Sequence, residues 1–459
     1  ETLTEEEVYT YLNDNFVSVF IDADINGVAY KQYKAQGVPY TVFLNPDSSL
    51  YFKYSGTLYA EQFLDVIQDV NQSIKRGIIL NQEEKENFEY DVPIKFSKKT
   101  IDNFRETFTK GVLDSFDPKE YGIGRKEKSI LPETFNYLLK NTKAKERSDS
   151  IYFISGTLEK AIDKIYDPIE GGFFRYAETR DWQIPHYEKM ADLNAATALL
   201  LYKVNRENPN PKLKKAADQT IEYLSKTLYN ANIGSFLSFQ QADTSYYYLK
   251  KHRREHVEKP LVIKKIFTDN LAVTVNYLLQ ILDYTENESL EDKVRRSLDF
   301  LADMILKHES LFHYYSIPKK EWRARSGLSD YAFLTKLFQQ ASVKYPSDRY
   351  RQAASKILRI SRREYYDAEK QIFIDRQLDT KDYEYLMEIN AGFALGLMGE
   401  STNNNGKLEN NVKPLIRYFS GLEELLEERL WDGNNWELLE RYATFLNSAD
   451  GYLSAQTIQ

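Results

Sequence analysis

The feature that most constrains the fold is a long succession of amphipathic helical segments that begins near residue 96 and continues towards the end of the chain. Apolar residues recur there at helical spacing, and the segments are separated by loops that contain Gly, Pro, Asp and Asn. No strand pattern of comparable strength accompanies them. Roughly a dozen helices without a sheet to cover predict an all-α domain built of helical hairpins, because each apolar face must be buried against another helix.

The predicted helices cover residues 133–141, 151–166, 189–205, 211–228, 268–284, 290–307, 328–343, 349–365, 386–398, 409–428 and 435–447. A closed ring of six hairpins, an (α/α)6 toroid over residues 96–459, accounts for their number. A superhelical repeat array is the alternative, although the sequence shows no fixed repeat period.

The first 76 residues follow a different pattern, which alternates short apolar strands with helices. Strands are predicted at 16–22, 40–46 and 50–56, and helices at 25–36 and 59–76. Pro39 stands immediately before the second strand and is a candidate cis-proline, because cis peptide bonds occur almost only before proline. These residues form a separate α/β domain, and the charged, irregular residues 77–95 are predicted to be a linker.

Charge and cysteine content exclude several classes of function. The net charge is −8, and the one short basic cluster, Lys250–Arg254, is mixed with acids, which argues against nucleic acid as a partner. No apolar run reaches the length of a membrane span. The chain has no cysteine and its five histidines lack ligand spacing, so neither a metal nor another cofactor is expected. Cysteine content leaves the cellular compartment open.

The segment EGGFFRYAETRDWQIPHYEKM is too polar for a core and too aromatic for an ordinary surface loop. Arg175 could make a two-pronged contact with a carboxylate or with vicinal hydroxyls, and Trp182 offers a flat face to a sugar ring. His186 could act as a general acid or base near neutral pH, and Glu188 could orient it or serve as the acid. The alternative is structural, with an Arg175–Glu188 ion pair and a hydrogen-bonded interior histidine.

Three further segments place carboxylates in loops or at predicted helix starts, namely Asp243, Asp269 and Asp330. An N-cap explains such residues without any chemistry. In a ring of hairpins, however, the starts of alternate helices converge on one mouth, where we expect a single pocket. The predicted catalytic residues are His186, Glu188 and Asp330, and the predicted ligand-binding residues are Arg175, Tyr176, Trp182, Asp243, Asp269 and Tyr331.

The N-terminal residues resemble the thioredoxin fold from its first helix onward. The resemblance rests on VYTYLNDNFVSVFID, on the turn with Val38-Pro39, on VFLNPD and on the glycine before the last helix. It implies a first strand and a Cys-x-x-Cys motif upstream of Glu1. We therefore expect that the chain begins inside a helix and that residues precede it or were removed.

Later motifs resemble the bacterial YyaL family and the related spermatogenesis-associated proteins, which join a thioredoxin-like domain to an all-helical, six-hairpin glycosidase-like domain. EGGFFRYAETRDWQIPHYEKM matches the family's GGGF-His-RY…W-x-x-PH-F-EKM run, which adds Lys189 to the ligand-binding candidates, and SFQQADTS, TDN and LSDYAF match further family motifs. The resemblance covers about four-fifths of the chain, and the helical domain is similar to N-acylglucosamine 2-epimerases and helical-barrel glycosidases, which implies a carbohydrate by fold analogy.

Several family positions differ in this chain. Phe174 replaces the family histidine and Gln241 the first Asp of Asp-Ala-Asp, while the Trp after Thr-Asp and the late Pro-Ser-Gly-Asn segment have no counterpart. Three hypotheses remain. The first is a carbohydrate-binding or carbohydrate-processing protein, which as an enzyme would be a sugar epimerase or glycoside hydrolase. The second is a non-catalytic interaction or structural subunit that binds a protein partner or larger assembly. The third is a thiol-redox protein, which requires Cys-x-x-Cys upstream of Glu1.

Overall fold

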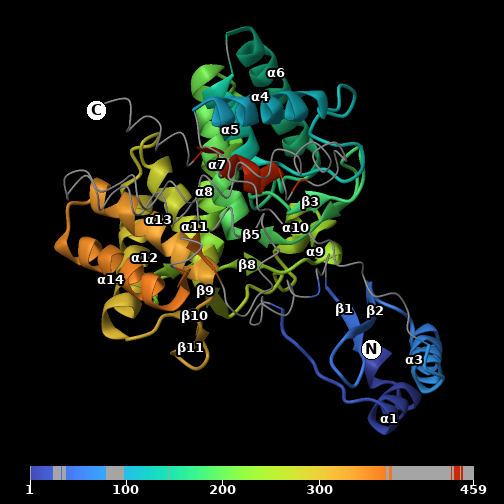
Figure 1. Ribbon diagram of the computed structural model, residues 1–459. Helices are drawn as coiled ribbons and strands as arrows, with labels where there is room; N and C mark the ends of the chain where they lie inside the picture. The colour runs from blue at the N-terminus through green and yellow to red at the C-terminus, as the bar shows by residue number, and fades with distance from the viewer. Residues whose placement is uncertain are drawn as a thin grey trace. The chain divides into compact units, whose positions relative to one another are not determined.

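The computed structural model describes residues 2–23, 33, 38–78, 98–142, 144–367, 372–374, 436, 439–444 and 446–447. They belong to two compact units, the first within residues 2–78 and the second within 98–447 (Figure 1). The helices predicted at 386–398 and 409–428, the helix at 25–36 apart from Tyr33, and most of the 77–95 linker lie outside the described residues.

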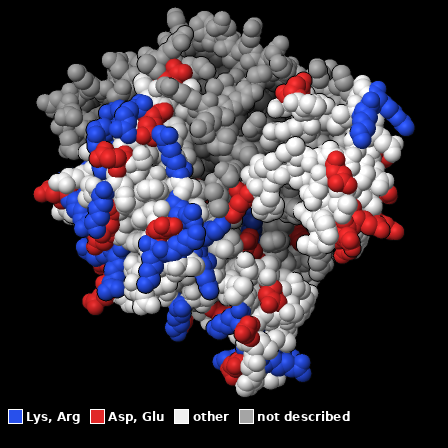
Figure 2. Space-filling view, turned by 90° about the horizontal axis from the view of Figure 1, so that it is seen from below, with Lys and Arg blue, Asp and Glu red and all other residues white. Residues whose placement is uncertain are grey.

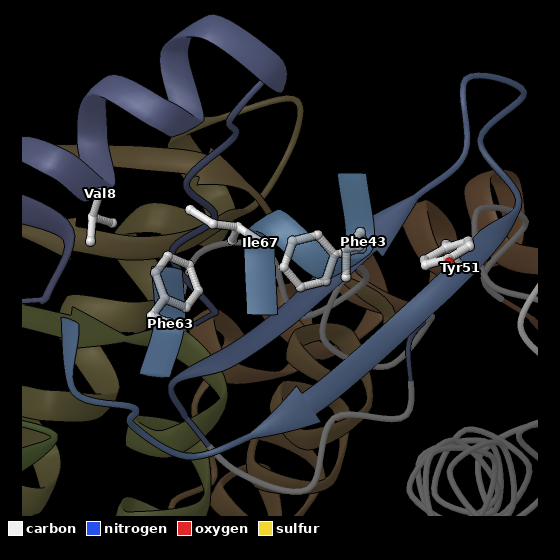
Figure 3. Packing of buried hydrophobic residues seen from close by; sticks show 6 residues of the cluster. Val8, Phe43, Tyr51, Phe63 and Ile67 are labelled. Carbon is white, nitrogen blue, oxygen red and sulfur yellow. The ribbon is translucent and has the colours of Figure 1, made fainter. Parts of the chain in front are cut away.

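The first unit combines a β-hairpin with two helices. β1 (Tyr40–Leu44) pairs antiparallel with β2 (Leu50–Ser55), and α1 (Glu6–Asn15), which follows the short η1 (Thr2–Thr4), packs on α3 (Ala60–Lys75). Its buried cluster contains Val8 of α1, Phe43 of β1, Tyr51 of β2 and three residues of α3, namely Phe63, Ile67 and Val70 (Figure 3). The Val38–Pro39 peptide bond, which precedes β1, is cis.

The strand predicted at 16–22 is wrong. Val17, Val19 and Phe20 are 95%, 75% and 89% exposed, and β1 and β2 pair only with each other among the described residues. Apolar composition alone does not make a strand, because a strand needs a neighbour that accepts and donates its backbone hydrogen bonds. The described part of this unit therefore does not by itself show the predicted thioredoxin fold.

The second unit is a double layer of helices (Figure 1). The inner helices are α5 (Pro132–Asn141), α7 (Ala191–Glu207), α11 (Thr268–Ile281) and α13 (Leu328–Lys344). The outer helices are α4 (Lys98–Asp114), α6 (Ala144–Lys164), α8 (Pro211–Thr227), α12 (Glu288–Lys307) and α14 (Asp348–Tyr365). Neighbouring inner helices pack side by side, and α8, α12 and α14 each pack on an inner helix next to them in sequence. Residues 439–444 and 446–447 are helical as well, and Glu440 among them contacts the start of α5.

Burial separates the two layers. Eleven of the 17 residues of α7 are buried, against seven of 17 in α8. The outer helices therefore show the one-sided apolar pattern that is easy to recognise in a sequence, whereas the inner helices are enclosed on most sides. On the face shown in Figure 2, the described surface carries both acidic and basic side chains. None of the described helices has both the length and the apolar character needed to cross a membrane.

Short strands connect the helices, although the sequence predicted none of comparable strength. β5 (Lys189–Met190) pairs with β8 (Phe239–Gln240), and β10 (Phe312–Ser316) pairs with both β9 (Lys265–Phe267) and β11 (Glu321–Arg325). Because β5, β9 and β11 directly precede α7, α11 and α13, this pairing gathers the starts of the inner helices at one end of the ring. Two to five residues are too few to show a strand period in sequence.

The remaining short elements lie in the same connections. They are β3 (Tyr176–Ala177), which pairs with β4 (Pro185–His186), β6 (Tyr229–Asn230) with β7 (Ser235–Phe236), β12 (Tyr366–Asp367) with β13 (Ile372–Phe373), and the single-turn helices α9 (Thr244–Tyr247) and α10 (Lys251–Arg254).

Two buried ion pairs hold equivalent turns between an outer and an inner helix. Lys128 Nζ lies 3.1 Å from Asp117 Oδ2, and Lys189 Nζ lies 2.9 Å from Asp167 Oδ2, with all four side chains fully buried. Each aspartate follows an outer helix, and each lysine precedes the next inner helix. Gly171 belongs to the second turn, where its φ of +80° and the carbonyl of Gln219, 2.5 Å from any added Cβ, leave no room for a side chain.

Replacing Asp167 by Asn should lower the free energy of unfolding by about 3–5 kcal/mol, because it leaves the Lys189 ammonium and the Arg254 guanidinium uncompensated in the interior. Urea unfolding followed by circular dichroism measures the change. Asp163→Asn is the matched control, since Asp163 pairs with Lys212 on the surface and should change stability by less than about 1 kcal/mol. Equal changes in the free energy of unfolding for the two substitutions would contradict the role of Asp167 as the partner of buried charges.

Candidate functional site

Each of the four described inner helices carries an acidic residue in its first turn. These residues are Glu133 in α5, Asp192 in α7, Asp269 in α11 and Asp330 in α13. The amino end of a helix carries partial positive charge and favours a carboxylate there. Because the four helices begin at the same end of the ring, their acids are brought towards one place.

A cavity of about 290 Å³ lies among these helix starts. Glu133, Asp192 and Asp269 line it, together with Glu440 from the last helical segment. Its other described lining residues are Asn270, Ala272, Val273, Asn276, Tyr277, Phe333, Lys336 and Thr444. A larger depression of about 500 Å³ lies on the outer helices α12 and α14, beside Leu306 and Arg359. The candidate site is the inner cavity, because that is where titratable groups converge from several helices.

The cavity acids differ in protonation. Burial raises the pKa of Asp192 to about 6 and that of Glu440 to about 8. Burial also opposes ionisation of Glu133, but the nearby Lys336 ammonium and the Tyr277 hydroxyl, with other donors, hold its pKa below the usual value. Side chains whose environments separate their pKa values in one cavity are suited to proton transfer.

A second cluster lies at the start of α11 and α13. His313 Nδ1 is 2.9 Å from Asp330 Oδ2, and Asp330 also accepts the backbone N–H groups of Asp269 and Gly327. Burial raises the pKa of Asp330 to about 6. The ligand atoms of Asp269, His313 and Asp330 all lie within 4.8 Å of one another, a donor set that could hold a divalent cation. The hydrogen bonds among these groups account for the cluster without an ion.

The predicted residues around Tyr176 and His186 form a rim near the cavity. The two rings stack with centroids 4.9 Å apart, and Tyr176 lies 6.4 Å from the ring of Trp436. Arg175 Nη1 pairs with Glu188 Oε2 at 2.9 Å. The charge of Arg175 lowers the pKa of Asp192, against the larger effect of burial, so this rim and the cavity are electrostatically connected. The contact between Arg175 and Glu188 is the ion pair that the structural interpretation of this segment predicted.

Four predicted ligand-binding residues are engaged in contacts within the fold. Trp182 is fully buried, and its indole N–H donates to the carbonyl of Glu120, so its face is closed to a sugar. Lys189 is the buried partner of Asp167. Tyr331 is fully buried against other side chains. Asp243 caps α9 by accepting the N–H of Tyr246. The aromatic and charged composition around Trp182 thus reflects the packing of a turn.

Sequence reasoning missed Glu133, Asp192, Glu440, His313 and Trp436. The first two stand one position inside helices, in LPET and KMAD, where an acid is common for reasons of helix stability alone. Their shared position in successive inner helices is the signal that could have identified them. Nothing local distinguishes Glu440, His313 or Trp436, since their neighbours in space come from distant parts of the chain.

No family model matches the chain. The uncharacterized protein B0495.5 of Caenorhabditis elegans is 26% identical over 270 residues, which cover 53% of this chain and 36% of that protein. Human spermatogenesis-associated protein 20 is 25% identical over 276 residues, which cover 53% of this chain and 34% of that protein. The chain thus spans about a third of the length of these curated relatives.

Solved structures share the fold at low sequence identity. Cellobiose 2-epimerase from Spirochaeta thermophila has a TM-score of 0.57 and 10% identity, covering 78% of this chain and 99% of its own. D-mannose isomerase has a TM-score of 0.55 and 11% identity, covering 77% and 98%. A family 76 mannosidase from Bacteroides thetaiotaomicron has a TM-score of 0.51 and 9% identity, covering 79% and 100%. The helical unit therefore has a fold of the (α/α)6 toroid type, as in these structures.

Replacing Asp192 by Asn should stabilise the protein near pH 7.5 and have little effect near pH 4. The folded-state pKa of about 6 lies above that of the unfolded chain, so the stability contributed by the neutral carboxyl is present below about pH 4 and lost as pH rises through 6. The difference between the two pH values should be about 2–3 kcal/mol in urea unfolding. Asp283→Asn, at an exposed site beyond the other end of α11, should show no such difference.

Proposed function

We propose that the helical unit binds a carbohydrate in the cavity and carries out acid–base chemistry on it. The observation that carries this proposal is the convergence of Glu133, Asp192, Asp269 and Glu440, from four separate helical segments, on one cavity of about 290 Å³. This volume is close to the lower end of the range for small-molecule sites, about 300–1,000 Å³, and suits a single sugar ring. The likeness in fold to a cellobiose 2-epimerase, a D-mannose isomerase and a family 76 mannosidase supports the same ligand class.

The chemistry of the lining matches a polyhydroxylated ligand. Carboxylates are strong acceptors, and each can accept hydrogen bonds from two vicinal hydroxyls. Tyr277 and Phe333 add apolar surface for the C–H face of a ring. At the rim, the stacked rings of Tyr176 and His186 with Trp436 nearby offer a second aromatic surface for a further sugar unit.

Isothermal titration calorimetry with a panel of mono- and disaccharides tests the proposal. At least one should bind, and Asp269→Asn should weaken binding about 10- to 100-fold, because a hydrogen bond to a charged group is worth about 1.5–3 kcal/mol. Asp283→Asn is the matched control beyond the far end of the same helix. Absence of binding by every sugar in the panel would overturn the proposed function.

A further inference from the structure

Glu133 of α5 and Glu440 of the last described helical segment lie beside each other in the lining of the cavity. Glu440 accepts the backbone N–H of Glu133 at 3.1 Å and that of Thr134 at 2.9 Å, through different carboxyl oxygens. These are first-turn N–H groups of α5, whose N-cap residue, Leu131, provides no side-chain acceptor. Glu440 is thus held in a fixed orientation beside Glu133, and both side chains line the cavity.

Glu133 has its own set of donors. The Tyr277 hydroxyl donates to Oε1, and Asn447 Nδ2 donates to Oε2 at 2.7 Å. Together with the Lys336 charge from α13, these donors favour the ionised form of Glu133. Each oxygen of Glu440 likewise accepts one hydrogen bond, from a backbone N–H, and a further lone-pair direction can carry a proton.

The two side chains therefore differ in charge at neutral pH. Burial and the charge of Glu133 raise the pKa of Glu440 to about 8, against the effect of its backbone donors. The other titratable groups that line the cavity are Asp192 of α7, Asp269 and Tyr277 of α11 and Lys336 of α13. A neutral carboxylic acid thus lies beside a carboxylate held ionised by hydrogen bonds.

We propose, on the basis of the carbohydrate site above, that Glu440 and Glu133 are the acid and the base that hydrolyse a glycosidic bond in this cavity. Glu440 donates its proton to the glycosidic oxygen as the bond from the anomeric carbon to that oxygen breaks. Glu133 takes a proton from the water whose oxygen forms the new bond to the anomeric carbon. An alcohol and a hemiacetal leave, and return of the proton from Glu133 to Glu440 through solvent restores the pair.

Hydrolysis fits these groups better than epimerisation next to a carbonyl. Removal of a proton from carbon needs a strong base, whereas the hydrogen bonds that hold Glu133 ionised also weaken it as a base. A carboxylic acid paired with a carboxylate is the combination that glycosidic cleavage requires.

Hydrolysis should be measured on natural disaccharides, by release of reducing ends, and on p-nitrophenyl glycosides. Glu440→Gln should lower kcat on disaccharides about 10²- to 10⁴-fold but have a much smaller effect on nitrophenyl glycosides, whose leaving group needs no proton. Glu133→Gln should impair both. The wild-type rate on disaccharides should fall above about pH 8 as Glu440 loses its proton. Activity of Glu440→Gln on nitrophenyl glycosides also shows that this variant folds.

Glu207→Gln, at the exposed end of α7 where Glu207 pairs with Arg147, is the control and should keep full activity. Sugar binding without hydrolysis, or equal loss on both substrate classes for Glu440→Gln, would overturn the inference and leave the proposed carbohydrate binding in the cavity intact. Solvent hydrogen exchange at C2 of a bound sugar without hydrolysis would also overturn it. Failure of the wild-type protein to bind any sugar would overturn the proposed function itself.

Discussion

The buried aspartate–lysine pairs are the interactions on which the arrangement of the cavity depends. Asp117 with Lys128, and Asp167 with Lys189, each join the end of an outer helix to the residues just before an inner helix. Each pair therefore determines where an inner helix begins, and with it the position of the acid in its first turn. A charge in the interior tolerates no misplacement of its partner, because an unpaired buried ion is strongly destabilising. The two ion pairs therefore help to position Glu133 and Asp192, which line the cavity.

The same turn recurs elsewhere in the ring, which explains why the sequence shows no repeat period. In four turns an aromatic residue pairs in a short ladder with the residue seven positions later, as Phe116 with Ile123, Tyr166 with Phe173, Tyr229 with Phe236 and Tyr366 with Phe373. Asp or Asn follows the first aromatic residue each time. The connections between these turns differ in length, so the motif repeats without a constant interval and escapes a search for periodicity.

Sequence reasoning located most of the helices, but α4 had no predicted counterpart and the start of α6 lies seven residues before the predicted one. Residues 211–228 and 349–365 agree with the outer helices α8 and α14 within a residue, and 133–141 and 328–343 agree equally well with the inner helices α5 and α13, because all four carry apolar residues at helical spacing. The segment at 16–22 failed since strand formation depends on a partner distant in sequence. Trp182 and Lys189 were chosen for their chemistry but are buried in a turn. Glu133 was missed because an acid near a helix start is unremarkable in isolation, and Glu440 because its neighbours in space come from a distant part of the chain.

The contact between Glu440 and the start of α5 joins residues 307 apart in sequence. Contacts of such separation form late, because closing so long a loop costs more conformational entropy than the local pairing of adjacent helices. The earlier hairpins can assemble during synthesis, whereas the cavity stays incomplete until the helical segment that carries Glu440 has emerged from the ribosome. Any chemistry in the cavity therefore requires a chain that already includes this segment.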